Sequence, residues 1–317
     1  MTANRPMPDA EASMLTQHPS NPSIHGGLSA VSSSDSSQGF TVQFWGVRGS
    51  VPTPGADTVR YGGNTACVEV LLGQHRIIFD GGTGLRVLGK HLQQQNHPVT
   101  AHILFTHTNW DRIQGFPFFG PAFIAGNQFD IYGATAANGA SIKQRLTDQM
   151  LRPNFFTPLQ KMAATMSFHT MIAGNIMTLE NGATIETVTL NSHTSALGFR
   201  ITYQGKSLVY ATDSNTTAAG PAPNLLYLSQ GADMLIYGGA YSETVDLDLE
   251  RDAAMPCDQN IEIAEKTQVK EMVLFHHNPL HDDDYLDHVE MEIHNRCPQL
   301  RLAREGMIMQ LAAHRLH

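Results

Sequence analysis

The segment Ala101-His-Ile-Leu-Phe-Thr-His-Thr-Asn-Trp-Asp-Arg-Ile-Gln-Gly115 joins a short apolar run to a cluster of polar side chains. The run 101–106 predicts a buried strand, because it is apolar and too short for a typical helix. His107, Asn109 and Asp111 follow where that strand ends. Side chains at strand ends meet at one edge of an α/β sheet. The segment therefore predicts one wall of a functional cleft.

Four other strand-like runs end in polar clusters of the same kind. These clusters are Asp80-Gly-Gly-Thr-Gly84, Asn191-Ser-His193, Asp213-Ser-Asn215 and His276-His-Asn-Pro-Leu-His281. Imidazoles and carboxylates that emerge from several strand ends can converge on one metal ion. A single cluster of this kind is a weak signal, but all of them together favour a common site.

The remaining pattern predicts an α/β fold of stacked sheets with helices on their outer faces. Turn signals at Asn181-Gly182 and Gln204-Gly205 predict two hairpins. Helical spacing or capping residues occur in four segments, 85–95, 141–151, 259–268 and 283–295. The stretch that carries Met162, Met166 and Met171 is expected to cover the cleft, because methionines suit an adaptable packing surface.

Composition excludes several classes of protein. Hydrophobic residues make up 41% of the 317 residues and charged residues only 15%, which excludes a wholly disordered chain. The net charge of −9 argues against a protein that binds mainly to nucleic-acid phosphates. The 3 cysteines are far apart, so we expect no disulfide framework. No apolar run is long enough for a membrane span, and we expect a soluble, cytoplasmic protein that does not bind membranes.

Residues 1–39 differ from the rest of the chain. They contain nine serines and four prolines and show no strand or helix period. Such a segment cannot bury enough apolar surface to offset the entropy lost on ordering. We therefore expect a disordered tail at 1–39 and one folded domain at 40–317.

With these motifs, the sequence resembles the metallo-β-lactamase fold hydrolases, in the branch near ribonuclease Z and the type II cyclic-nucleotide phosphodiesterases. The resemblance also rests on Trp45-Gly-Val-Arg-Gly-Ser-Val-Pro52, Tyr61-Gly-Gly-Asn-Thr65 and Leu197-Gly-Phe-Arg200, together with Tyr210-Ala-Thr-Asp213 and Leu274-Phe-His-His277. It extends from Phe40 nearly to the end of the chain. It implies a four-layer αββα sandwich with a metal cleft along one edge of the sheets.

The positions that resemble the family's metal ligands are only partly retained. They hold His107, Asn109, Asp111, Arg112, Ser192, Asp213 and His276. Asn109, Arg112 and Ser192 stand where the family has histidine. Asparagine and neutral serine are weak ligands, and arginine is a permanent cation that repels a metal. The stretch 252–258 also lacks the histidine of the family's G-H-S-T motif.

The retained residues define the candidate site. The candidate metal-binding remnants are His107, Asp111, Asp213 and His276, of which Asp111 and Asp213 are the candidate catalytic carboxylates. The other residues expected to line the cleft are Asp80, Asn109, Arg112, Ser192, His193 and His277. His193 could substitute for its neighbour Ser192 if the register slips by one residue.

Arg112 is expected to replace the charge of a metal ion. Clustered carboxylates repel one another, and a guanidinium can neutralise them through charged hydrogen bonds. We predict that it lies about 2.7–3.2 Å from Asp111 or Asp213. The alternative is that Arg112 points into solvent.

Three functions are compatible with this sequence. The first is a pseudo-hydrolase without a metal cofactor, which binds a small ligand such as a nucleotide, or a protein partner. The second is a hydrolase of phosphodiesters or cyclic nucleotides with a single divalent zinc, manganese or iron ion. The third is a scaffold protein. The family resemblance also suggests a homodimer.

Deletion of residues 1–39 should leave the melting temperature nearly unchanged, because nothing in their pattern predicts packing on the core. Differential scanning calorimetry of the full-length and shortened chains measures this. A drop of many degrees would show that the segment packs on the domain.

Overall fold

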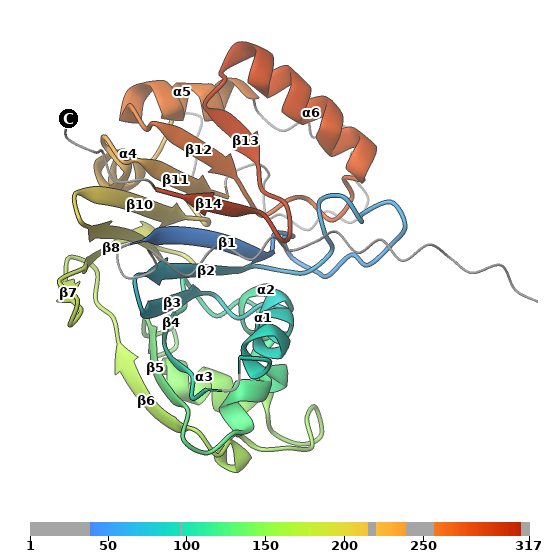
Figure 1. Cartoon of the computed structure of the whole chain (residues 1–317), viewed down its shortest axis with the longest axis vertical. Helices are drawn as coiled ribbons and strands as arrows, with labels where there is room; N and C mark the ends of the chain where they lie inside the picture. Colours follow the sequence, from blue (N-terminus) through green and yellow to red (C-terminus); the bar gives the residue numbers. More distant parts are fainter. Residues whose placement is uncertain (1–38, 96, 215–219, 239–256, 312–317) are drawn as a thin grey trace, which may run out of the picture. The chain divides into compact units, whose positions relative to one another are not determined.

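Two mixed seven-stranded sheets form the centre of the fold (Figure 1). The first sheet contains, in spatial order, β14 (Ile308–Gln310), β1 (Phe40–Gly46), β2 (Cys67–Leu72), β3 (His75–Phe79), β4 (Thr100–Leu104), β5 (Gln128–Gly133) and β6 (Thr165–Thr170). The second contains β13 (Leu300–Leu302), β12 (Glu271–Leu274), β11 (Met234–Tyr237), β10 (Lys206–Ala211), β9 (Ala196–Tyr203), β8 (Thr184–Asn191) and β7 (Ile176–Thr178). Strands β3 to β6 are parallel, as are β10 to β13.

The structure is a computed structural model that describes residues 39–95, 97–214, 220–238 and 257–311. All of these belong to one unit that spans residues 35–317. The expected tail lies outside the described residues, apart from Gly39.

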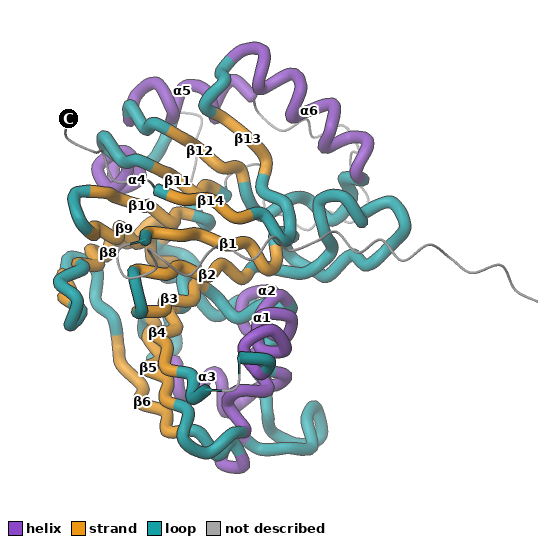
Figure 2. The backbone as a smooth tube through the Cα atoms, in the orientation of Figure 1, coloured by secondary structure: helices purple, strands orange, loops and turns teal. Residues whose placement is uncertain are grey.

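Helices cover the outer face of each sheet (Figure 2). Those of the first half are α1 (Gly84–Gln93), α2 (Trp110–Ile113) and α3 (Ile142–Gln149), with the 3₁₀ turns η1 (Phe116–Phe118), η2 (Gly120–Phe123) and η3 (Leu159–Lys161). Those of the second half are α4 (Pro223–Ser229), α5 (Cys257–Thr267) and α6 (Asp283–Arg296). No helix in the described ranges is long and apolar enough to cross a membrane.

Three apolar layers separate these four layers of secondary structure. One lies between the two sheets, and one lies between each sheet and its helices. In α1, the predicted spacing puts Leu85, Leu88 and Leu92 on the buried face. The four-layer αββα sandwich expected from the sequence is confirmed.

Aromatic side chains link the two sheets beside the polar edge. The ring of Phe79, at the end of β3, stacks on Tyr210 of β10 with centroids 4.6 Å apart. Phe199 of β9 packs against the same ring at 5.4 Å. Because Asp80 directly follows Phe79, this packing fixes the position of the first polar residue of the site.

The stretch expected to cover the cleft instead packs against the sheets, with Met162 and Met171 buried in the apolar layers, and that prediction was wrong. Met166 lies in β6, which pairs in parallel with β5 over six residues. Only Met166 and Phe168 of this strand are partly buried. Met166 and Phe168 alternate with polar residues, but two apolar positions are too short a pattern to identify a strand in a sequence.

Backbone contacts hold the β3–α1 loop against α2. Gly81 N donates to Arg112 O at 2.6 Å, and Gly115 N donates to Gly81 O at 2.9 Å. A Cβ atom on Gly115 would lie 1.8 Å from the carbonyl oxygen of Gly82. This glycine is therefore required by the close approach of two backbone segments.

Gly115→Ala should lower the melting temperature, because its φ of −82° suits alanine but the new methyl group cannot fit without backbone movement. We expect a loss of about 1–3 kcal/mol in the free energy of unfolding, as for other overpacked sites. Gly39→Ala is the matched control, since its Cβ would meet nothing closer than 3.9 Å. Equal stability of the two variants would contradict the packing described for this loop.

Candidate functional site

The predicted polar residues meet at one edge of the two sheets, where several strands end. Asp80 directly follows β3, and His107 lies three residues after β4. Asp213 and His276 each lie two residues after the strands β10 and β12. Each strand delivers its polar group to the same edge because the core fixes where that strand ends.

Asp80 and Arg112 form the centre of this polar cluster, and neither is exposed to solvent. One terminal nitrogen of Arg112 donates to Oδ2 of Asp80 at 2.9 Å. Tyr210 donates its hydroxyl to the same oxygen at 2.9 Å, and Thr106 donates both N–H and O–H to Oδ1. The same arginine nitrogen donates to Thr212 Oγ1 at 3.0 Å. The carboxylate and the guanidinium are thus both held from several sides.

Arg112 also contacts Asp111, as the sequence predicted. Its Nε lies 3.1 Å from Oδ2 of Asp111, an ion pair in which the N–H has no hydrogen-bond acceptor. His276 Nε2 lies 2.9 Å from the same carboxylate oxygen. The alternative of a solvent-facing Arg112 is excluded, because this side chain is 0% exposed.

His107 and Asp213 form a second group in the cluster. His107 Nδ1 lies 3.8 Å from Oδ2 of Asp213 and 3.0 Å from the hydroxyl of Thr106. Thr194 donates its hydroxyl to Asp213 at 2.7 Å, and Asn191 donates an amide N–H to it at 3.4 Å. Hydrogen bonds thus hold the Asp213 carboxylate in place.

The charges in the cluster are set by burial and by the guanidinium. Burial by itself would raise the pKa of Asp111, but Arg112 and the hydrogen bond from His276 outweigh it and lower that pKa. Burial would lower the pKa of Arg112, and the carboxylates of Asp111 and Asp80 reverse this and raise it. Each partner therefore stabilises the charged form of the other.

Both histidines of the cluster favour the neutral state. Burial, and then the positive charge of Arg112, lower the pKa of His107 despite the nearby Asp213. The same two causes lower the pKa of His276, against the effect of Asp111. The guanidinium thus supplies the main positive charge of the cluster.

The structure leaves three residues of the candidate set outside this buried cluster. Asn109, Ser192 and His193 are exposed, and the backbone N–H of His193 bonds to Asn191 Oδ1. His277 is instead fully buried, and its Nε2 lies 2.8 Å from the carbonyl oxygen of Ala303. Burial lowers its pKa to about 3. We therefore assign His277 to the packing behind the cluster.

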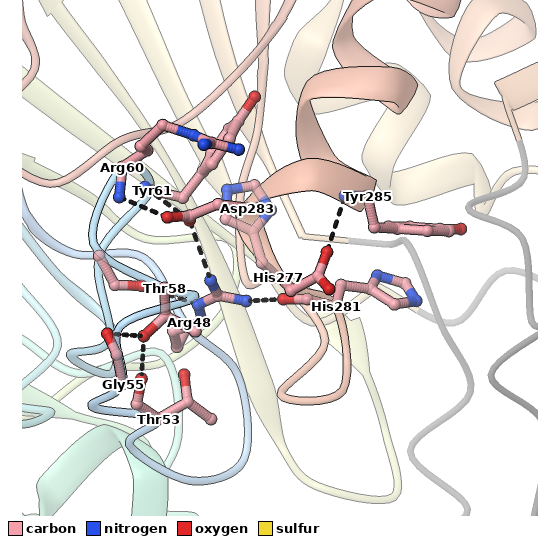
Figure 3. Close-up of polar contacts among 12 residues, drawn as sticks. Arg48, Thr53, Gly55, Thr58, Arg60, Tyr61, His277, His281, Asp283 and Tyr285 are labelled. Carbon is pink, nitrogen blue, oxygen red and sulfur yellow. Dashed lines mark hydrogen bonds and ion pairs between the residues drawn. The ribbon is translucent and has the colours of Figure 1, made fainter.

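Arg48 holds the segment that carries His276 (Figure 3). It is fully buried, and its Nε donates to Gly62 O at 2.7 Å. A terminal nitrogen donates to His281 O at 2.6 Å and to Asn278 O at 3.2 Å. One side chain thereby joins the β1–β2 loop to the segment after β12, which positions His276.

Asp283, the first residue of α6, strengthens the same junction. Its carboxylate accepts the backbone N–H of Arg60 at 2.7 Å and that of Tyr61 at 3.1 Å. It also lies 4.0 Å from the Arg48 guanidinium (Figure 3). Arg48 and Asp283 therefore both anchor the β1–β2 loop to the segment between β12 and α6.

These residues do not fit the dinuclear metal centre that the fold family implies. Arg112 fills the space between Asp80 and Asp111, and its permanent charge would repel a dication there. In the described ranges, no three His, Cys, Asp or Glu side chains are grouped so that they could hold a metal ion. Asn109 and Ser192, which stand at positions resembling the family's ligands, are exposed and could offer only weak ligands.

Sequence reasoning missed three hydroxyl groups that complete the cluster. They belong to Thr106, Thr194 and Tyr210, each of which donates to an aspartate. Each lies within three positions of a polar residue flagged from the sequence at a strand end. Their closeness in sequence to the flagged polar residues was the one signal that could have indicated them. Only the fold shows which of these side chains turns toward the cluster.

Comparison with known proteins supports the assignment of the fold. The family model described as "Beta-lactamase superfamily domain" matches residues 75–277. No curated protein matches the chain in sequence.

Several solved structures are similar over 86% of this chain. The metallo-beta-lactamase fold protein YhfI from Bacillus subtilis has a TM-score of 0.60 at 18% identity over 99% of its own chain. Zn(2+)-bound PqqB from Methylobacterium extorquens has a TM-score of 0.61 at 17% identity over 100% of its chain. The short form of human tRNase Z has a TM-score of 0.55 at 16% identity, also over 100%. These identities show a shared fold alone.

Arg112→Met should strongly destabilise the protein, because it leaves Asp80 and Asp111 buried without their counter-charge. We expect a loss of about 3–5 kcal/mol in the free energy of unfolding, measured by urea denaturation. Arg60→Met is the control, since the 47% exposed Arg60 side chain pairs with carboxylates at the surface. That change should cost less than about 1 kcal/mol.

The pH dependence of this difference separates lost charge from lost packing. In the wild type, the lowered pKa of Asp111 adds stability above the unfolded pKa of about 3.9, and this stability is lost as the pH falls. Without the guanidinium, burial raises the pKa of Asp111. Protonation of Asp111 at low pH then removes the unpaired buried charge and reduces the destabilisation of the variant. The stability difference should therefore shrink as the pH falls from about 7 to about 4. A constant difference would point to packing alone.

Proposed function

The chain belongs to the beta-lactamase superfamily, and from this membership we propose that it is a non-hydrolytic member that works by binding. The polar cluster lies where hydrolases of this fold have their active site. Its residues instead form a closed network of ion pairs and hydrogen bonds. A fold of this kind can host a different function, because function depends on the residues of the site.

The observation that carries this proposal is the position of Arg112. The guanidinium is fully buried and lies 2.9 Å from Asp80 and 3.1 Å from Asp111. In dinuclear hydrolases, two metal ions neutralise such carboxylates and activate a water molecule. A guanidinium neutralises carboxylates but does not lower the pKa of a bound water, so it preserves the fold without the hydrolytic function.

The two candidate catalytic carboxylates support the same proposal. Asp111 is held between Arg112 and His276, and Asp213 accepts hydrogen bonds from Thr194 and Asn191. The guanidinium stabilises the charged form of Asp111 and lowers its pKa, which makes this carboxylate a weak general base at neutral pH. We propose that the protein holds no resident metal and binds a small molecule, such as a nucleotide, or a protein.

A hydrolase with one divalent ion is the second candidate function. It is favoured by the pair His107 and Asp213, whose atoms lie 3.8 Å apart. The pKa of His107 is lowered, and neutral imidazole is the form that binds metals. Zinc, manganese and iron are the ions to test.

The purified protein should contain no stoichiometric metal and should hydrolyse cyclic nucleotides and activated phosphodiesters no faster than buffer. Metal analysis and assays with added zinc or manganese measure this. Stoichiometric metal with turnover that Asp213→Ala abolishes would contradict the proposal and establish the single-metal hydrolase. Turnover that survives Asp213→Ala would identify a contaminating enzyme.

Restoring the family's ligands tests the role assigned to Arg112. The triple variant Asn109→His, Arg112→His and Ser192→His should bind zinc, which then raises its melting temperature by mass action. The matched control carries Asn109→His and Ser192→His but keeps Arg112. It should show little zinc-dependent stabilisation, because the guanidinium still occupies the site. Equal zinc binding by both variants would show that Arg112 does not exclude the metal.

A further inference from the structure

In the part of the chain that the structure describes, the two sheets end in four edge strands of unequal length. Three of them have only three residues, namely β14, β13 and β7. The fourth is β6, which has six residues. Figure 1 shows β6 at the margin of the first sheet, beyond β5. Very short edge strands are a common protection against pairing with other chains, and β6 lacks it.

The sequence of β6 also lacks the other usual forms of protection. Thr165-Met-Ser-Phe-His-Thr170 contains no proline, lysine, arginine, aspartate or glutamate. Its pairing with β5 runs in regular register over six residues, whereas the β1–β2 and β8–β9 pairs contain shifts. Charges, prolines and bulges are the devices that keep natural edges from pairing. An edge without any of them is suited to receive another strand.

The side chains of β6 are divided between two faces. Met166 and Phe168 lie on the helix-covered face, where both are partly buried in the apolar layer. Thr165, Ser167 and His169 lie on the opposite face and are exposed. His169 forms an ion pair with Asp130 at 2.8 Å when it is protonated.

We propose that β6 pairs with β6 of a second copy of this chain, antiparallel and symmetric about Ser167. A two-fold axis perpendicular to the sheet makes the pairing antiparallel and keeps each face of the sheet continuous. In this register Met166 lies opposite the partner's Phe168, and Phe168 opposite the partner's Met166. Sulfur–aromatic contacts of this kind are favourable. Thr165 and the partner's His169 then meet on the other face.

The strand pattern favours a second copy over an unrelated peptide. Symmetric pairing about Ser167 matches both apolar side chains of the helix-covered face with each other, so the strand complements itself. Ile172 and Ile176, which are 62% and 65% exposed, follow β6 and add apolar surface near this edge. This inference does not depend on the proposed function, since β6 contributes no residue to the polar cluster.

Ser167→Lys tests the pairing, because it places two ammonium groups directly opposite each other on the two-fold axis. By sedimentation equilibrium of the full chain, the wild type should be a dimer. The variant should have a dimer Kd raised by about tenfold or more. Gln310→Lys is the matched control, an exposed strand residue on the short edge β14, and should leave the wild-type Kd unchanged. Melting temperatures near that of the wild type would show that both variants fold.

A mixture of Ser167→Lys and Ser167→Glu chains tests the register. The mixture should form heterodimers, because opposite charges then meet at the axis. A wild type that is monomeric at every concentration would overturn the proposal, as would a dimer that Ser167→Lys leaves intact. Dissociation by Ser167→Lys without recovery in the mixture would overturn the symmetric register. A monomer that binds an extended peptide of another protein would replace the second copy as the occupant of this edge.

Discussion

The ion pair between Asp80 and Arg112 links the packed core to the polar edge of the two sheets. Asp80 follows Phe79, whose ring stacks on Tyr210, and the Tyr210 hydroxyl donates to Asp80. Arg112 lies in α2, the first helix after β4, and its guanidinium is 2.9 Å from the Asp80 carboxylate. Both charges are fully buried, so each depends on the other. Loss of one would leave the other uncompensated in the interior.

In the proposed non-hydrolytic role, this arrangement would let the fold persist without a metal centre. Carboxylates gathered at strand ends repel one another unless a cation lies among them. Here the cation is part of the chain, and the pKa values of Arg112 and Asp111 move in opposite directions because each stabilises the other's charge. The neutral state of His107 and His276 follows from burial and from the same guanidinium. The network therefore stabilises the fold at this edge of the sheets.

Two regions of the structure are thus built on opposite physical principles. The polar cluster satisfies its charges internally. The Asp80 carboxylate, for example, accepts hydrogen bonds from Thr106, Tyr210 and Arg112. The edge strand β6 leaves one side of its backbone without a partner strand in the described part of the chain. Unpaired strand edges favour association with another chain, whereas a closed ion-pair network already satisfies its own charges. Association and ligand binding are therefore expected to use different surfaces of this protein.

The sequence by itself determined the fold class, most of the helices and strands, and the residue types at the site. Leucine spacing in α1 and the Asn181-Gly182 turn are local signals, because periodicity and turn chemistry act over a few residues. Only the tertiary structure decided which side chains meet. Arg112 and Asp80 are 32 positions apart, and Tyr210 and Asp80 are 130 apart. The role of β6 as an exposed edge was likewise invisible, because its strand pairing depends on β5 and not on its own apolar pattern.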